Sequence, residues 1–123
     1  MELDSERLRD LALKVLESLP HKIRDRLDNV DLVLEDWPSE HQLDVAGLDM
    51  PEELLGLYEG VPLTDRENYG MVLPDKISLF QGPIEIACAN DDEVERELRI
   101  TLVHEVAHHF GIDDHYLTEI GLG

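Results

Sequence analysis

The sequence predicts a fold that combines α-helices with β-strands, because its apolar residues follow two different periods. Between residues 8 and 19 they recur at intervals of three or four, which is typical of an amphipathic helix. Between residues 30 and 35 they recur at every second position, which is typical of a half-buried strand. A second helical segment, which ends near residue 110 and carries several histidines, is apolar over most of its circumference.

The N-terminal part is predicted to contain two helices and a strand. Asp4 or Ser5 is placed to cap the first helix, and Pro20 ends it. A second, shorter helix is predicted from Pro20 to about Leu27. The alternation of Val, Leu and Leu with Asp, Val and Glu over residues 30 to 35 then predicts the first strand.

The middle of the chain is predicted as two strands and two loops. Residues 37 to 53 carry two prolines and a glycine without clear periodicity, so we expect a long loop. Residues 54 to 59 and 76 to 81 have the pattern of strands, and Gly82 and Pro83 end the second of these.

The last long helix is predicted to be central. Asn90 or Asp91 is placed to cap its start, and Gly111 is expected to end it, because glycine readily adopts the left-handed conformation of a helix terminus. From Leu98 onward the apolar positions cover more than half of the circumference, so the helix should be largely enclosed. Arg99 falls within this apolar arc and is expected either to reach solvent or to pair with a carboxylate.

The size and charge of the chain limit its class. A chain of 123 residues is long enough for one hydrophobic core, so a single domain over residues 1–123 is expected. A net charge of −19, from 29 acidic and 10 basic residues, would repel phosphates and anionic lipids, so binding to nucleic acid or to a membrane is not expected. Cys88 is the only cysteine and no signal peptide or membrane span is evident, which favours a cytoplasmic protein.

A histidine cluster over residues 104 to 115, HEVAHHFGIDDH, carries the chemistry. His104 and His108 are one helical turn apart on one face, so their imidazoles can bind a single cation, and zinc accepts such ligands. Glu105 lies about 100° further round the helix. Its carboxylate can therefore reach a water on the metal and act as a general base without becoming a ligand.

A catalytic zinc site usually takes three protein ligands, so a third must follow His108. Beyond the bend at Gly111, Asp114 has the spacing expected of that ligand, and Asp113 and His115 are its alternatives. His109 points about 140° away from His104 and is expected to pack rather than to bind metal.

The sequence resembles a known family through these residues. HEVAHHFGIDD is similar to the extended zincin pattern His-Glu-x-x-His-x-x-Gly-x-x-His/Asp, in its aspartate-ending form. LLGLYEGVPL and KISLFQGPIE resemble strand segments of the small bacterial zincin-like metallopeptidases, sometimes called minimal zincins. The resemblance covers roughly residue 30 to the end. The methionine turn of the larger metzincins is absent, since no methionine follows Met71.

The resemblance implies a small α+β domain in which the motif helix and the N-terminal helix pack on a mixed sheet of three to four strands. It also implies that the strand before the motif helix, residues 76 to 81, lies at the edge of the cleft and pairs with an extended peptide. The alternative is an ordinary interior strand. Tyr116 is expected either to stabilise an oxyanion or simply to pack.

The leading hypothesis is a zinc-dependent peptidase or amide hydrolase acting on peptides or proteins. His104, His108 and Asp114 would hold one zinc ion, and Glu105 would be the catalytic residue. Two alternatives stay open. In one, the metal is structural and His115 completes its ligands, and in the other the chain is an acidic interaction module.

Overall fold

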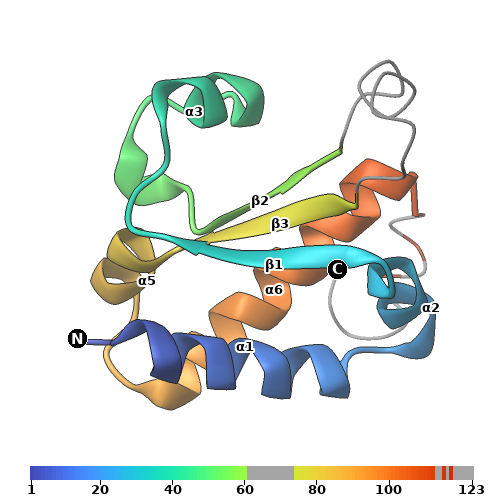
Figure 1. Ribbon diagram of the computed structural model, residues 1–123, viewed down its shortest axis with the longest axis horizontal. Coiled ribbons are helices and arrows are strands. Elements are labelled where there is room, and N and C mark those ends of the chain that lie inside the picture. The colour runs from blue at the N-terminus through green and yellow to red at the C-terminus, as the bar shows by residue number, and fades with distance from the viewer. Residues whose placement is uncertain (61–73, 113–114, 116, 118–123) are drawn as a thin grey trace.

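The protein is described from a computed structural model, which describes residues 1–60, 74–112, 115 and 117. The described residues form α-helices packed on a small mixed sheet, which confirms the predicted α+β class (Figure 1). Two helices, α1 and α6, lie on one face of the sheet, and α3 lies on the other. The elements are α1 (Ser5–Ser18), α2 (His21–Arg24), the 3-10 turn η1 (Asp25–Leu27), β1 (Val30–Glu35), α3 (Glu40–Ala46), the 3-10 turn η2 (Pro51–Glu53), β2 (Gly56–Glu59), β3 (Asp75–Phe80), α5 (Gln81–Ala87) and α6 (Asp91–Phe110).

The three described strands form a mixed sheet in the order β1-β3-β2. β1 runs parallel to β3, and β2 runs antiparallel to it, with Gly56 opposite Leu79 and Glu59 opposite Lys76. Both sides of β3 are therefore occupied by neighbouring strands. The prediction that this strand lies at the edge of the cleft and pairs with an extended peptide is wrong, because β1 and β2 already pair with its two sides; its interior alternative is confirmed.

The predicted limits of the two long helices are confirmed. Asp4 caps α1, since its Oδ1 accepts a hydrogen bond from the backbone N–H of Arg7 at 2.8 Å. Asn90 caps α6 in the same way, through the N–H of Glu93 at 2.9 Å. α6 ends at Gly111, whose φ of 65° is the left-handed conformation that glycine adopts without strain.

The prediction of a loop over residues 37 to 53 is wrong, because α3 forms within it. Ser39 and Gln42 make a capping box: the Ser39 hydroxyl accepts from the Gln42 N–H at 3.1 Å, and the Gln42 Oε1 accepts from the Ser39 N–H at 2.9 Å. Gly47, with φ 73°, ends the helix. Reciprocal capping at one end and a glycine at the other stabilise a helix of only seven residues.

A further helix, α5, follows β3 directly, where only the end of a strand was predicted. Gly82 and Pro83 lie in its first turn, where proline is tolerated because the backbone N–H it lacks has no partner inside the helix. Gly82 has to be small as well. A Cβ atom there would lie 2.4 Å from Cε2 of Trp37, so the indole of Trp37 packs directly on the backbone.

The main hydrophobic core lies between the sheet and the pair α1 and α6. It consists largely of aliphatic side chains with little or no exposed surface, among them Leu8, Leu11, Val15, Ile77, Leu79, Ile84, Leu98, Leu102 and Val106. A smaller cluster lies on the opposite face, under α3, and contains Leu43, Leu54, Leu57 and Phe80. The sheet therefore has an apolar layer on each side, which matches the near-continuous burial of β3.

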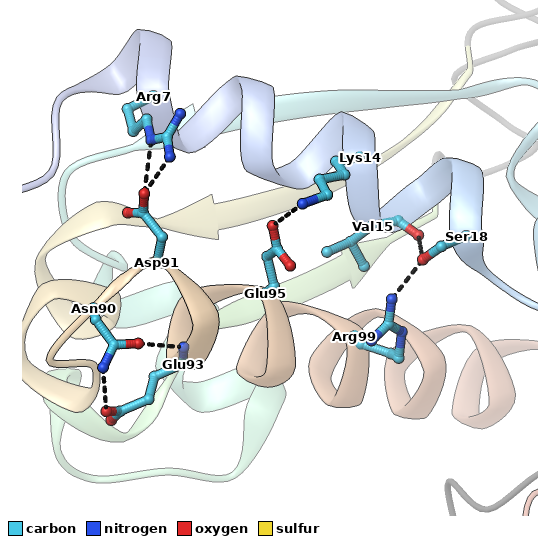
Figure 2. A network of polar contacts seen from close by, with 9 residues as sticks. All are labelled: Arg7, Lys14, Val15, Ser18, Asn90, Asp91, Glu93, Glu95 and Arg99. Carbon is cyan, nitrogen blue, oxygen red and sulfur yellow. Dashed lines mark hydrogen bonds and ion pairs between the residues drawn. The ribbon is translucent and has the colours of Figure 1, made fainter.

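Polar contacts along one side fix α1 against α6 (Figure 2). Near the start of α6, Arg7 pairs with Asp91, and this carboxylate raises the pKa of the Arg7 guanidinium. Further along, Lys14 Nζ lies 2.8 Å from an oxygen of Glu95. Arg99 donates to the hydroxyl of Ser18 at 2.6 Å and so reaches the polar surface, one of the two outcomes predicted for it. These contacts hold the long helix at a fixed rotation.

In the part of the chain that the structure describes, no helix has both the length and the apolar character needed to cross a membrane.

Candidate active site

The buried positions of α6 show which of its faces points inward and therefore where its histidines lie. In the last three turns the inward positions are the buried residues Leu102, Val103, Val106 and Ala107. His104 and His108 fall between these positions, one turn apart, and both are exposed. Two imidazoles with that spacing are donors of the kind that zinc takes, so this part of the ligand set suits the metal.

Glu105 is half-buried between the helix and the edge strand β2. Its Oε2 accepts a hydrogen bond from the backbone N–H of Tyr58 at 3.2 Å. Burial raises the pKa of the Glu105 carboxyl, and the Tyr58 N–H and the positive charge that His108 and His104 carry when protonated oppose this increase. A carboxylate with a raised pKa and a fixed orientation is suited to act as a general base.

His109 packs against the sheet, as predicted. Its ring stacks on Tyr58 with the centroids 4.1 Å apart and makes an edge contact with Phe110 at 4.8 Å. Its Nε2 lies 3.9 Å from Oδ2 of Asp75, which also accepts a hydrogen bond from the Tyr58 hydroxyl at 2.7 Å. Neither Tyr58 nor Asp75 was predicted to take part, because such contacts depend on how strands pack and leave no local sequence signal. Together they anchor the end of α6 to β2 and β3.

The residues expected to complete the metal site fall mostly outside the described ones. Asp114 and its alternative Asp113 lie there, whereas His115 is described and is exposed. Tyr116, the candidate for stabilising an oxyanion, also lies outside the described residues. Over residues 1–60, 74–112, 115 and 117, no three His, Cys, Asp or Glu side chains form a group that could hold a metal ion. The assignment of Asp114 as third ligand therefore stays a prediction.

A pocket with a volume of about 420 Å³ opens beside Glu105. This volume lies within the range of about 300 to 1,000 Å³ that is typical of small-ligand sites. Its lining residues come from the motif helix, from β2 and from the segment between α3 and β2. The lining residues are Glu105, His108, His109 and Tyr58, followed by Val45, Ala46, Leu48, Leu54 and Leu57.

The α3 part of this pocket was missed because residues 37 to 53 were predicted to be a loop. A signal was present: Ser39 followed three positions later by Gln42 is the sequence pattern of a capping box, and Gly47 is a helix terminator. Between them, Leu43 and Ala46 have the spacing of one helix face.

Comparison with known proteins agrees with the motif and the fold. A family model described as zincin-like metallopeptidase matches residues 27–123, which include the three described strands and the motif helix. No curated protein shows a significant sequence match. A family match over most of the chain implies zinc binding and a peptide substrate in general terms. The chain therefore belongs to the zincin-like metallopeptidase family.

Proposed function

We propose that the protein is a single-domain zinc-dependent metallopeptidase, spanning residues 1–123, that hydrolyses peptide or amide bonds. His104, His108 and Asp114 would hold one zinc ion, and Glu105 would be the general base. The observation that supports this best is the position of Glu105: a half-buried carboxylate, oriented by the Tyr58 N–H at 3.2 Å, on the wall of a pocket that also contains His108. Membership of the family agrees with it.

The chemistry divides between the metal and this chain. Zinc, when bound, would supply the Lewis acidity that makes water nucleophilic at neutral pH and polarises the substrate carbonyl. Glu105 would accept the proton from the attacking water and pass it to the departing amine. The Tyr58 N–H donates to Oε2 of Glu105, and Glu105 also lines the pocket. Packing of His109 on Tyr58 keeps the strand and the helix in register for this contact.

The substitution Glu105→Gln tests the proposal. The amide keeps the shape of the side chain and can still accept from the Tyr58 N–H, but it is no base, so hydrolysis should fall by about 10²- to 10⁴-fold while zinc is retained. Turnover is measured by mass spectrometry on a mixed peptide pool, and zinc by elemental analysis. The matched control is Glu97→Gln, which removes another half-buried carboxylate of α6. It should leave the rate of hydrolysis and the zinc content unchanged.

If Glu105→Gln hydrolyses peptides as fast as the parent protein, Glu105 is not the base and the mechanism is wrong. If the parent protein binds zinc stoichiometrically but cleaves no peptide in the pool, the non-catalytic alternative replaces the peptidase.

A further inference from the structure

The two walls of the pocket beside Glu105 differ in chemistry. The α6 wall carries the carboxylate of Glu105 and the imidazoles of His108 and His109. The lining residues from α3 to Leu57 are all aliphatic and together are called the aliphatic wall: Val45, Ala46, Leu48, Leu54 and Leu57. A peptide backbone held beside Glu105 would therefore place a neighbouring side chain close to aliphatic side chains, which form no hydrogen bonds. Such a surface favours an apolar group, because contact with it removes both partners from water.

The aliphatic wall is preformed. Leu54 and Leu57 are only 4% exposed and belong to the apolar cluster under α3. Gln42, on the same helix and 6% exposed, donates from its Nε2 to Oε2 of Glu35 at 3.0 Å and to Oε1 of Glu59 at 2.9 Å. These bonds tie α3 to both edge strands of the described sheet. A pocket whose walls are fixed in advance loses little entropy when it binds a ligand.

Val45 extends the aliphatic wall to the surface. It lines the pocket and is nevertheless 58% exposed. Large apolar side chains that stay in water beside a pocket are typical of a binding surface rather than of a core. An incoming apolar group would cover Val45 on entering.

The chain around this wall is strongly acidic. Between Arg26 and Arg66 the sequence contains no lysine or arginine. Exposed carboxylates lie in the same segment of the chain as the aliphatic lining residues, on Asp44, Asp49, Glu52 and Glu53. Lys76, the cation closest in the sheet, already lies 3.9 Å from an oxygen of Glu59. Positive charge on a ligand would be attracted here, most strongly at low ionic strength.

We propose that the pocket binds one bulky apolar side chain of the substrate, adjacent to the bond that is cleaved, and that the acidic surface around it selects for lysine or arginine nearby. The substrate class is then a cationic peptide with an apolar residue at the cleavage position. This inference rests on the proposed peptidase function, since it takes Glu105 to mark the reacting centre.

The test measures binding rather than turnover. Full-length protein with Glu105→Gln is titrated, by fluorescence anisotropy, with four labelled peptides that carry leucine or glycine at the centre and lysine or glutamate in the flanks. The peptide with leucine and lysine should bind at least about 10-fold tighter than its glycine counterpart, given the transfer free energy of a leucine side chain. Glutamate flanks should weaken binding, and added salt should reduce that difference.

Two surface variants test whether the leucine side chain binds at the aliphatic wall. Val45→Asp puts a charge on the aliphatic wall and should abolish the preference for leucine, whereas Ile86→Asp, at a 63% exposed position on α5, should leave it intact. Both positions are exposed, so both variants should fold, which circular dichroism checks. Val45→Asn replaces the charged variant if that one is unfolded.

The proposal is overturned if leucine gives no advantage over glycine, or if Val45→Asp and Ile86→Asp behave alike. That failure is distinct from failure of the peptidase assignment. Loss of hydrolysis in Glu105→Gln without any leucine preference would reject only the pocket. A leucine preference that depends on Val45, together with unchanged hydrolysis in Glu105→Gln, would reject the role of Glu105 and the position of the pocket next to the cleaved bond, but not the binding of an apolar side chain in the pocket.

Discussion

At the scale of single residues, Glu105 is placed for chemistry at the expense of stability. Burial disfavours its charged form, and the Tyr58 N–H only partly compensates, so its pKa is raised in the folded, metal-free protein. The folded state therefore binds a proton at Glu105 more tightly than the unfolded chain does. The destabilisation by the charged Glu105 carboxylate is complete above the pKa that Glu105 has in the folded protein. It disappears as the pH falls from that pKa to the lower pKa of the unfolded chain.

Glu105→Gln should for this reason stabilise the protein after zinc has been removed with a chelator. At pH 7 the variant carries no buried charge, and the gain should stay below about 1 kcal/mol, because the partly exposed carboxylate is screened by solvent. The free energy of unfolding is measured by urea denaturation at several pH values between 8 and 5. The gain should shrink as the pH falls. A variant that is less stable than the parent at pH 7 would contradict this reading of Glu105.

The sequence predicts the relative positions of site residues that lie on the same helix. The shared face of His104 and His108, and the offset of Glu105, follow from the helical repeat alone. The packing of His109 was also predicted, by exclusion from that face, and is confirmed by its stacking on Tyr58. The partners themselves, the Tyr58 backbone and Asp75, come from strands far away in the sequence. No local pattern specifies such contacts.

At the scale of elements, long periodic segments were predictable and short capped ones were not. α1, α6 and β1 have enough repeats for the period to be recognised within their own length. α3 and α5 have seven residues each, and prolines and glycines in or beside them obscured their pattern. The order of the strands was likewise beyond the sequence, because a period of two shows which face is buried but not which neighbour pairs with the strand.

Gln42 connects α3 to the rest of the protein, so Gln42→Ala should destabilise it. The substitution removes the reciprocal cap and the donor shared by Glu35 and Glu59, which should lower the free energy of unfolding by about 1 to 3 kcal/mol. Urea denaturation followed by circular dichroism measures this. Glu40→Ala, an exposed position in the first turn of the same helix, is the control and should change stability by less than about 0.5 kcal/mol.

Zinc content provides a second readout for Gln42→Ala. α3 contributes none of the proposed ligands, so the variant should bind zinc like the parent while its pocket binds leucine peptides more weakly. Equal stability of Gln42→Ala and Glu40→Ala would mean that the bonds to the two strands do not hold α3 in place.

At the scale of the whole molecule, the net charge of −19 works against the compact state. Screening of this repulsion should outweigh the loss of exposed ion pairs such as Lys14 with Glu95, since exposed pairs contribute little. Raising sodium chloride from about 20 to 200 mM shortens the screening length and should raise the melting temperature by a few degrees. Differential scanning calorimetry on metal-free protein measures it. A melting temperature that falls with salt would show that ion pairs dominate instead.

The proposed function requires that His104 and His108 bind the same zinc ion and that His109, on the same helix, does not bind it. Zinc titration calorimetry on the folded parent protein and on three alanine variants tests this most directly. We expect one zinc ion per chain and binding weakened by at least about 100-fold in His104→Ala and in His108→Ala. Binding should be retained in His109→Ala, because the His109 ring packs on Tyr58. Undiminished binding in His108→Ala, or a folded His109→Ala that has lost zinc as completely as His108→Ala, would contradict it.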